Sequence, residues 1–134
     1  MDLGLLDLDQ IQPPHVVDDG QYKLEIIKEP EKVQSKKDDD RYMVRIYLKV
    51  VDDPDAELIM ENLCLIKADD KPDTAKMFGR GMKSFCQAFN IPFQGNNAQF
   101  EGSKGMTGWG MVKKEFNSEF NKDQNTVTRY ILPK

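Results

Sequence analysis

Cationic, aromatic and thioether side chains alternate with apolar ones over residues 41–51, which read RYMVRIYLKVV. The apolar set is Tyr42, Val44, Ile46, Leu48 and Val50, and the intervening set is Arg41, Met43, Arg45, Tyr47 and Lys49. Because successive side chains of a strand point to opposite faces, this pattern predicts one buried face and one exposed face. Cations that neutralise phosphates and flat groups that meet unpaired bases suit a platform for single-stranded nucleic acid. An ordinary half-buried strand with a solvated face shows the same alternation.

A second candidate surface lies in residues 104–116, KGMTGWGMVKKEF. Alternation places Trp109, Met111, Lys113 and Glu115 on one face of a strand and Gly108, Gly110, Val112, Lys114 and Phe116 on the other. If the Trp109 face is outward, the indole forms a stacking site beside Lys113, and if it is inward, Trp109 belongs to the core. The glycines let a strand bend around a small barrel or let another backbone come close.

Further cations extend these two surfaces. Lys36 and Lys37 precede the alternating strand, where they either clamp phosphate or form a self-neutralised charge run with Asp38–Asp40. For Tyr47 the alternative to base stacking is packing against a neighbouring strand. The predicted nucleic-acid contacts are Lys36, Lys37, Arg41, Arg45, Tyr47, Lys49, Lys104, Trp109, Lys113 and Arg129.

Residue types argue against an enzyme. His15 is the only histidine, which excludes a multi-histidine metal site and disfavours Ser-His or Cys-His catalysis. Neither cysteine is in a C-x-x-C pair, and no G-K-[ST] phosphate loop occurs. The carboxylate clusters at 38–40, 52–55 and 69–73 fall in predicted turns, so a magnesium-dependent nuclease ranks last. We therefore predict a protein that is no enzyme and binds no cofactor or metal.

The charge of the 134-residue chain is unevenly distributed around a net −4. Residues 1–40 hold five lysines against eleven carboxylates, whereas residues 72–134 hold nine cations against five carboxylates. An acidic head on a basic body is compatible with a nucleic-acid binder whose cations are focused in one groove. It is equally compatible with a protein that binds no polyanion.

Length and apolar content predict one compact domain with a real core. Cys64 and Cys86 lie in apolar surroundings and indicate buried free thiols in a reducing compartment. No stretch is long enough to cross a membrane, and the start MDLGLLDLDQ lacks the basic and hydrophobic regions of a signal peptide. A cytoplasmic protein with no membrane contact is expected, and a homo-oligomer is compatible with the sequence.

The acidic start is expected to be an arm over residues 1–19, followed by a domain over residues 20–134. The arm contains Pro13-Pro14, which disfavours a helix through it, and it either stays loose, docks on the domain or docks on a partner. The predicted strands of the domain are residues 20–29, 41–51, 57–66, 105–117 and 124–132. Residues 94–105 are expected to form a loop or a short strand.

A helix is predicted over residues 74–90, where Phe78, Met82, Phe85 and Phe89 recur four, three and four residues apart. Gly79 and Gly81 weaken its first half, so a well-formed helix is expected only over about residues 81–90. Asp73 or Thr74 is the expected N-cap, and Pro92 the expected stop.

The predicted order is three strands, a helix and two strands, which is the order of a five-stranded OB-fold barrel with its helix between strands three and four. Such barrels bind oligonucleotides on the face of strands two and three and on flanking loops. The alternating strand RYMVRIYLKVV is the second strand, so element order and face chemistry point to the same surface.

Several segments together resemble one family. They are Gly20-x-Tyr22, QSKKDDDRY, GRGMKSFCQAFNIPF, Phe100-Glu101-Gly102-Ser103-Lys104 and Asn125-Thr126-Val127-Thr128-Arg129-Tyr130. In this order they resemble small bacteriophage proteins encoded among replication and recombination genes, which look like single-stranded-DNA-binding proteins of OB-fold type. The resemblance implies a host-cytoplasmic protein that binds and protects single-stranded DNA with little sequence preference. Replication or recombination proteins are the further partners it implies.

The C-terminus departs from that pattern. Many single-stranded-DNA-binding proteins end in an acidic tail that recruits other replication proteins, whereas this chain ends RYILPK. The acidic-apolar residues 1–10 are a conceivable substitute for that tail. The alternative function is a protein-interaction module of OB type that binds no nucleic acid.

Overall fold

The computed structural model describes residues 1–37 and 40–133, which form a mainly β structure with one α-helix. The elements are η1 (Leu8–Gln10), β1 (Gly20–Ile26), β2 (Glu31–Gln34), β3 (Tyr42–Val50), β4 (Ile59–Cys64), α1 (Pro72–Ala88), β5 (Phe93–Gln94), β6 (Asn97–Ala98), β7 (Thr107–Asn117) and β8 (Lys122–Ile131). Each of the five predicted strands has a counterpart in β1, β3, β4, β7 or β8. No helix of the described chain is long and apolar enough to span a membrane.

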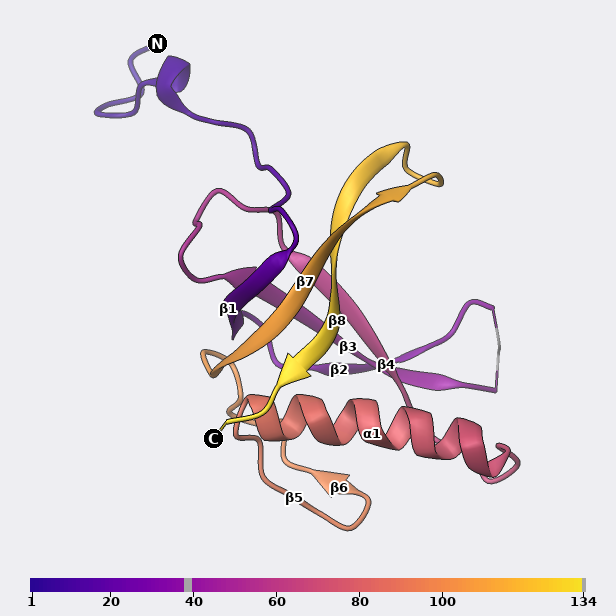
Figure 1. The fold of residues 1–134 in the computed structure, drawn as a ribbon. Helices are drawn as coiled ribbons and strands as arrows, with labels where there is room; N and C mark the ends of the chain where they lie inside the picture. The colour runs from indigo at the N-terminus through magenta and orange to yellow at the C-terminus, as the bar shows by residue number, and fades with distance from the viewer. Residues whose placement is uncertain (38–39, 134) are drawn as a thin grey trace.

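All strands of the main sheet pair antiparallel, in the order β2-β3-β1-β7-β8. Strands β1 and β2 pair with opposite ends of the same edge of β3, and β4 pairs with the other edge. The sheet folds back on itself, so that the long β7–β8 hairpin crosses over β3 and β4 (Figure 1). Strands β4 and β8 contact one another, but no strand pairing joins them among the described residues. The predicted closed barrel of five strands is therefore not confirmed.

One strand region was not predicted, and a second was expected only as a loop or a short strand. Strand β2 lies between the predicted strands 20–29 and 41–51, where the sequence indicates a polar connection, and it pairs with the first half of β3, from Glu31 opposite Arg45 to Gln34 opposite Tyr42. Strands β5 and β6 form a separate two-stranded sheet around the turn at Gly95. Both segments are short and polar, so their pairing depends on tertiary position rather than on an apolar repeat.

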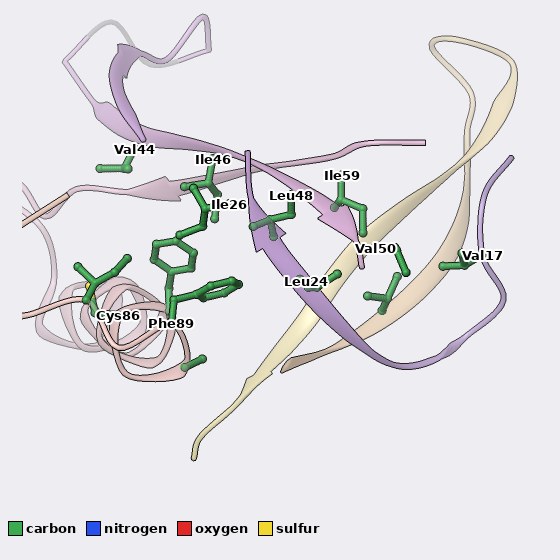
Figure 2. Packing of buried hydrophobic residues seen from close by; sticks show 14 residues of the cluster. Val17, Leu24, Ile26, Val44, Ile46, Leu48, Val50, Ile59, Cys86 and Phe89 are labelled. Atoms are coloured by element: carbon green, nitrogen blue, oxygen red, sulfur yellow. The ribbon is translucent and has the colours of Figure 1, made fainter. Parts of the chain in front are cut away.

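The core fills the space between the folded sheet and α1. Figure 2 shows Leu24 and Ile26 of β1 meeting Ile46 and Leu48 of β3 in one cluster, with Phe89, the C-cap residue of α1, against it. These five side chains are at most 1% exposed. The helix closes one end of the folded sheet, because its rings of Phe85 and Phe89 pack edge-on against Tyr130 of β8.

Helix α1 is regular over both glycines, so the expectation of a helix shortened to about residues 81–90 was wrong. Its N-cap is Lys71 rather than Asp73 or Thr74, and Pro72 takes the first helical position, where its missing N–H costs no hydrogen bond. The helix ends at Ala88, four residues before Pro92, with Phe89 as its C-cap, and the next residue, Asn90, has a left-handed φ of 58°. The N–H of Ile91 then donates to the carbonyl of Cys86 at 2.8 Å, a hydrogen bond typical of a Schellman motif.

Gly108 allows β7 to approach the end of this helix. A Cβ at that position would lie 2.6 Å from the carbonyl oxygen of Ala88, a distance that real Cβ atoms do not show. The sequence interpretation that a glycine lets another backbone come close is confirmed here, and it identifies the helix as that backbone.

The N-terminal arm is attached to the domain only near its end. Residues 1–15 are exposed, and Figure 1 shows the arm extending away from the sheet. Attachment begins at His15, whose carbonyl accepts from Glu57 at 2.8 Å. It continues at Val17, whose N–H and carbonyl both bond the side chain of Asn125, at 2.8 and 2.9 Å.

Candidate nucleic-acid interface

Strand β3 has the two faces that its alternation predicts. Val44, Ile46, Leu48 and Val50 are at most 6% exposed and form part of the core. Tyr42, which we placed with them, is 43% exposed because it lies at the start of the strand, beyond the core, with Lys32 Nζ 4.7 Å from its ring centroid. The buried face thus begins at Val44, the fourth residue of the predicted strand.

The opposite face of β3 joins that of β4 to form what we call the β3 surface: Arg45, Tyr47, Lys49, Met60 and Asn62. Antiparallel register sets Tyr47 opposite Met60 and Arg45 opposite Asn62. The Nε of Arg45 donates to Oδ1 of Asn62 at 3.0 Å, which orients the guanidinium along the strand pair. Three of the predicted contacts are therefore brought together on one face, next to a thioether and an amide that sequence reasoning did not include.

Cations and carboxylates alternate around the β3 surface. Lys28 Nζ lies 5.4 Å from the ring centroid of Tyr47 and 3.5 Å from Glu31. Lys49 Nζ lies 3.9 Å from Glu25 of the neighbouring strand. These ion pairs are solvent-exposed, and such pairs contribute little to stability, so an arriving phosphate competes with the carboxylates at small cost.

Arg41 occupies a different environment from the other predicted cations. Its guanidinium donates to both carboxylate oxygens of Asp70, at 3.0 and 2.7 Å, and to the carbonyl of Leu65 at 2.9 Å. It also lies 4.8 Å from the ring centroid of Phe78, and its side chain is only 13% exposed. These hydrogen bonds hold the pKa of Asp70 at about 2. The structure thus places Arg41 in a link between the β2–β3 loop, the end of β4 and the start of α1.

Trp109 points away from the core and is 42% exposed, which decides between the two alternatives left open by the sequence. Its cross-strand neighbours are Lys23 of β1 and Ile131 of β8, while Met111 faces Arg129. We call this group the Trp109 surface: Lys23, Trp109, Met111, Lys113, Arg129 and Ile131. Lys113 Nζ lies 3.7 Å from Glu115, whereas Lys23 and Arg129 form no salt bridge within the described residues.

The two surfaces do not merge into one groove. Tyr47 lies opposite Ile27, the residue after β1, and Trp109 lies opposite Lys23 of β1. The two rings are therefore two strand spacings apart across the sheet and four residues apart along β1. Usual strand dimensions make this roughly 16 Å along the sheet. The inward side chains of β3 and β7 pack in one core. Their outward side chains therefore point away from one another. The predicted contacts thus divide into two groups.

The remaining predicted cations lie in loops. Lys36 and Lys37 are exposed between β2 and β3, and their neighbours Asp38 and Asp39 fall outside the described residues. Lys104 is exposed in the turn before β7, which is held to the end of β1 by a 2.7 Å hydrogen bond from Gly105 N–H to the carbonyl of Ile26.

Sequence reasoning missed Glu61, which points inward from β4. It is level with the core residue Ile46, and its Oε1 accepts a hydrogen bond from the backbone N–H of Val127 on β8. Burial raises the pKa of Glu61 to about 7, against this hydrogen bond, and repulsion from Glu115 adds to the rise. Glu61 thus bridges the seam between β4 and β8, where the described residues form no strand pairing. The available signal was a carboxylate in the inward row of that strand, between Ile59 and Leu63.

Two exposed aromatic rings at the tip of the β7–β8 hairpin were also missed. Phe116 and Phe120 are each 63% exposed, Phe116 near the end of the predicted strand 105–117 and Phe120 in the polar connection that follows it. Lys122 Nζ lies 3.7 Å from Glu57, which brings the base of the tip to the chain that enters β4. The signal was the occurrence of phenylalanine in a turn otherwise made of Asn, Ser, Glu and Lys.

No protein-family model matches this chain, and no curated protein matches it at a significant level. Across residues 1–37 and 40–133, no group of three His, Cys, Asp or Glu side chains is placed to hold a metal ion. The two surfaces, the hairpin tip and Glu61 are therefore the observations that bear on function.

Proposed function

We propose that this chain binds single-stranded DNA with little sequence preference, through the β3 surface. The observation that supports the proposal is the arrangement of β3 itself. Val44, Ile46 and Leu48 enter the core, while Arg45, Tyr47 and Lys49 leave from the opposite face beside β4. An aromatic ring flanked by a guanidinium and an ammonium, on a pair of hydrogen-bonded β-strands, is typical of proteins that bind single-stranded nucleic acid.

The strand order agrees with this proposal. Taking β1, β3, β4, β7 and β8 as strands one to five, the helix falls between the third and fourth, and the first pairs with both the second and the fourth. We propose that this is an OB-fold barrel whose last seam, between β4 and β8, is held by Glu61 rather than by a backbone ladder. In such barrels the surface of strands two and three binds oligonucleotides, and here that surface is the β3 surface.

Binding in this proposal is electrostatic and stacking. A phosphate displaces Glu25 from Lys49, and another accepts from Arg45, while a base stacks on Tyr47. Each stacked base contributes about 1–3 kcal/mol. Lys36 and Lys37 extend the cationic path at one end of β3, and the rings of the hairpin tip offer further stacking. Coating a strand in this way protects it during bacteriophage replication or recombination, the setting that the sequence resemblance suggests.

One observation favours a second candidate, a protein-interaction module that binds no nucleic acid. The cations of both surfaces stand beside carboxylates, as in the pairs Lys49–Glu25 and Lys113–Glu115, and the whole chain carries −4. An interleaved surface repels a polyanion more than an unbroken cationic one does.

Fluorescence anisotropy of a labelled oligo-dT, titrated with the protein at low and moderate salt, decides between the candidates. Micromolar or tighter binding that weakens steeply with salt is the expected result, because each neutralised phosphate lowers log K by about 0.7 per log unit of salt. Absence of binding at low salt would reject the DNA proposal and favour the interaction module.

A further inference from the structure

An apolar groove of about 480 Å³ lies between α1, the end of β4 and the β5–β6 hairpin. Its apolar lining comes from Cys64, Ile66, Phe78, Met82, Cys86 and Phe93. Ile66 is 54% exposed and Phe93 is 43% exposed, so the groove is open and its rim is itself apolar. None of the described residues that line it belongs to the β3 surface or to the Trp109 surface.

The charge beside the groove is positive. Lys83 is the charged residue among those described that line it, and they include no carboxylate. Lys76, Gly79 and Lys83 lie three and four residues apart and so share one side of α1, which places a second ammonium along the same wall. Both lysines are exposed. The groove therefore suits an apolar segment that carries negative charge.

The N-terminal arm is such a segment. Residues 1–12, MDLGLLDLDQIQ, combine three aspartates with leucines that nothing in the described chain covers. Leu5 is 108% exposed, Leu6 53% and Leu8 61%. Asp7 accepts from the N–H of Asp9 at 3.0 Å and so caps the short helix η1, in which Leu8 is exposed. Exposed leucines in a row are unusual for a monomer and mark an interaction segment.

We propose that residues 1–12 of one copy dock in this groove of a second copy, with the leucines against the apolar lining and the aspartates beside Lys76 and Lys83. The arm leaves the domain at His15 and Val17, at the end of the molecule opposite α1 and β5–β6 (Figure 1). The arm of one copy therefore reaches outward, toward a neighbour, from the end of the molecule opposite its own groove.

Such a contact is head-to-tail: the donating surface and the accepting surface differ. Head-to-tail contacts form rings or open chains rather than closed pairs, so copies aligned along one DNA strand would be linked in series. The contact itself does not depend on DNA binding, and either property can be absent without the other.

Disulfide trapping in the full-length protein tests the placement. In a Leu5→Cys variant oxidised with diamide, the new thiol should link to Cys64 of another copy and give dimers and longer ladders on a non-reducing gel. Adding Cys64→Ser should remove the ladder, and Ser118→Cys, at the exposed hairpin tip, is the matched control that should give none. A link within one chain would place the arm in its own groove and overturn the proposal, as would the absence of any Leu5–Cys64 link.

Sedimentation velocity without oxidant tests the energetics. The wild-type sedimentation coefficient should rise with protein concentration, and Leu5→Ser with Leu8→Ser should weaken association at least about tenfold, because two leucines lose their burial. Leu58→Ser, at another exposed leucine, should leave association unchanged. Lys83→Glu should weaken association about 2- to 5-fold, and adding Asp7→Lys should restore it. A wild-type protein that stays monomeric at all concentrations would overturn the proposal.

Discussion

The β3 surface and the Trp109 surface each set an aromatic ring among cations, yet they present that ring in different ways. Tyr47 is half-buried, faces Met60 across the strand pair and has Lys28 near its ring. Trp109 is 42% exposed, and its neighbours Lys23 and Ile131 stand on the adjacent strands. The ring of Tyr47 is thus held among neighbouring side chains, whereas the ring of Trp109 is more exposed to solvent.

This difference indicates how the two surfaces would share a DNA strand. Side chains that are already ordered lose less conformational entropy when a ligand arrives, so the β3 surface is the better primary site. The Trp109 surface offers more free ring area but less order, which suits an extension of the site that only a longer strand reaches. Four predictions test this division of roles, beginning with the seam that fixes the two surfaces relative to each other.

The largest effect is expected from Glu61→Gln, through stability. The folded protein keeps a proton on Glu61 up to about pH 7, whereas the unfolded chain loses it near 4.5. The folded state thus binds more protons in this interval, and stability falls as pH rises through it. Glutamine keeps an acceptor for Val127 N–H without the charge. The variant should therefore be about 3 kcal/mol more stable than wild type above pH 7 and equal to it below about pH 4.5.

Urea unfolding at several pH values measures this difference. Glu119→Gln, at the exposed hairpin tip, is the matched control and should follow the wild-type curve. If Glu61→Gln keeps the wild-type pH dependence of stability, the buried carboxyl of Glu61 does not cause that dependence. The seam between β4 and β8 must then be held by other contacts.

The next effect concerns affinity for a short oligo-dT. Tyr47→Leu should weaken binding by about 1–3 kcal/mol, or roughly 5- to 150-fold, because it removes one stacked base. Tyr42→Leu is the matched control, since Tyr42 lies on the same strand, faces the other way and also has a lysine near its ring. Equal losses in both variants would show that the binding face of β3 is not the one assigned here.

Much of this arrangement follows from periodic patterns in the sequence. The two-residue alternation of β3 correctly separated its core face from its exposed face after Tyr42, and the repeat of Phe78, Met82 and Phe85 correctly indicated a helix. These signals are strong because each depends on burying one face of a regular element against the core. Tertiary packing also keeps α1 intact across Gly79 and Gly81, where propensity alone predicted a break.

Features that depend on long-range partners could not be predicted in this way. The engagement of Arg41 by Asp70 joins residues 29 positions apart, and nothing in the alternating strand distinguishes Arg41 from Arg45. The outward direction of Trp109 depends on which face of β7 meets the helix, and the inward face is the one on which Gly108 leaves no room for a Cβ beside the carbonyl of Ala88. The separation of the two surfaces likewise follows from how the sheet folds back, which no local pattern records.

Trp109 reports on its own surface, because it is the only tryptophan of the chain. An oligo-dT of about six nucleotides should bind with little change in Trp109 fluorescence, whereas one of about sixteen should quench it, given the usual range of site sizes. Trp109→Leu should accordingly weaken binding of the longer strand more than that of the shorter one. Full quenching by the short strand would place the primary site on the Trp109 surface instead and reverse the comparison.

The smallest effect is expected in the salt dependence. Lys49→Gln on the β3 surface should reduce the slope of log K against log salt by about 0.7, because one fewer phosphate is neutralised. Lys114→Gln is the matched control: Lys114 is also exposed and also faces a carboxylate, Asp18 at 3.2 Å, but it is on the side of β7 opposite Trp109. Its slope should equal that of wild type. Because the total number of lysines changes equally in both variants, a slope that falls in both would indicate attraction by overall charge, and a slope that falls only for Lys49→Gln would indicate a phosphate bound at the β3 surface.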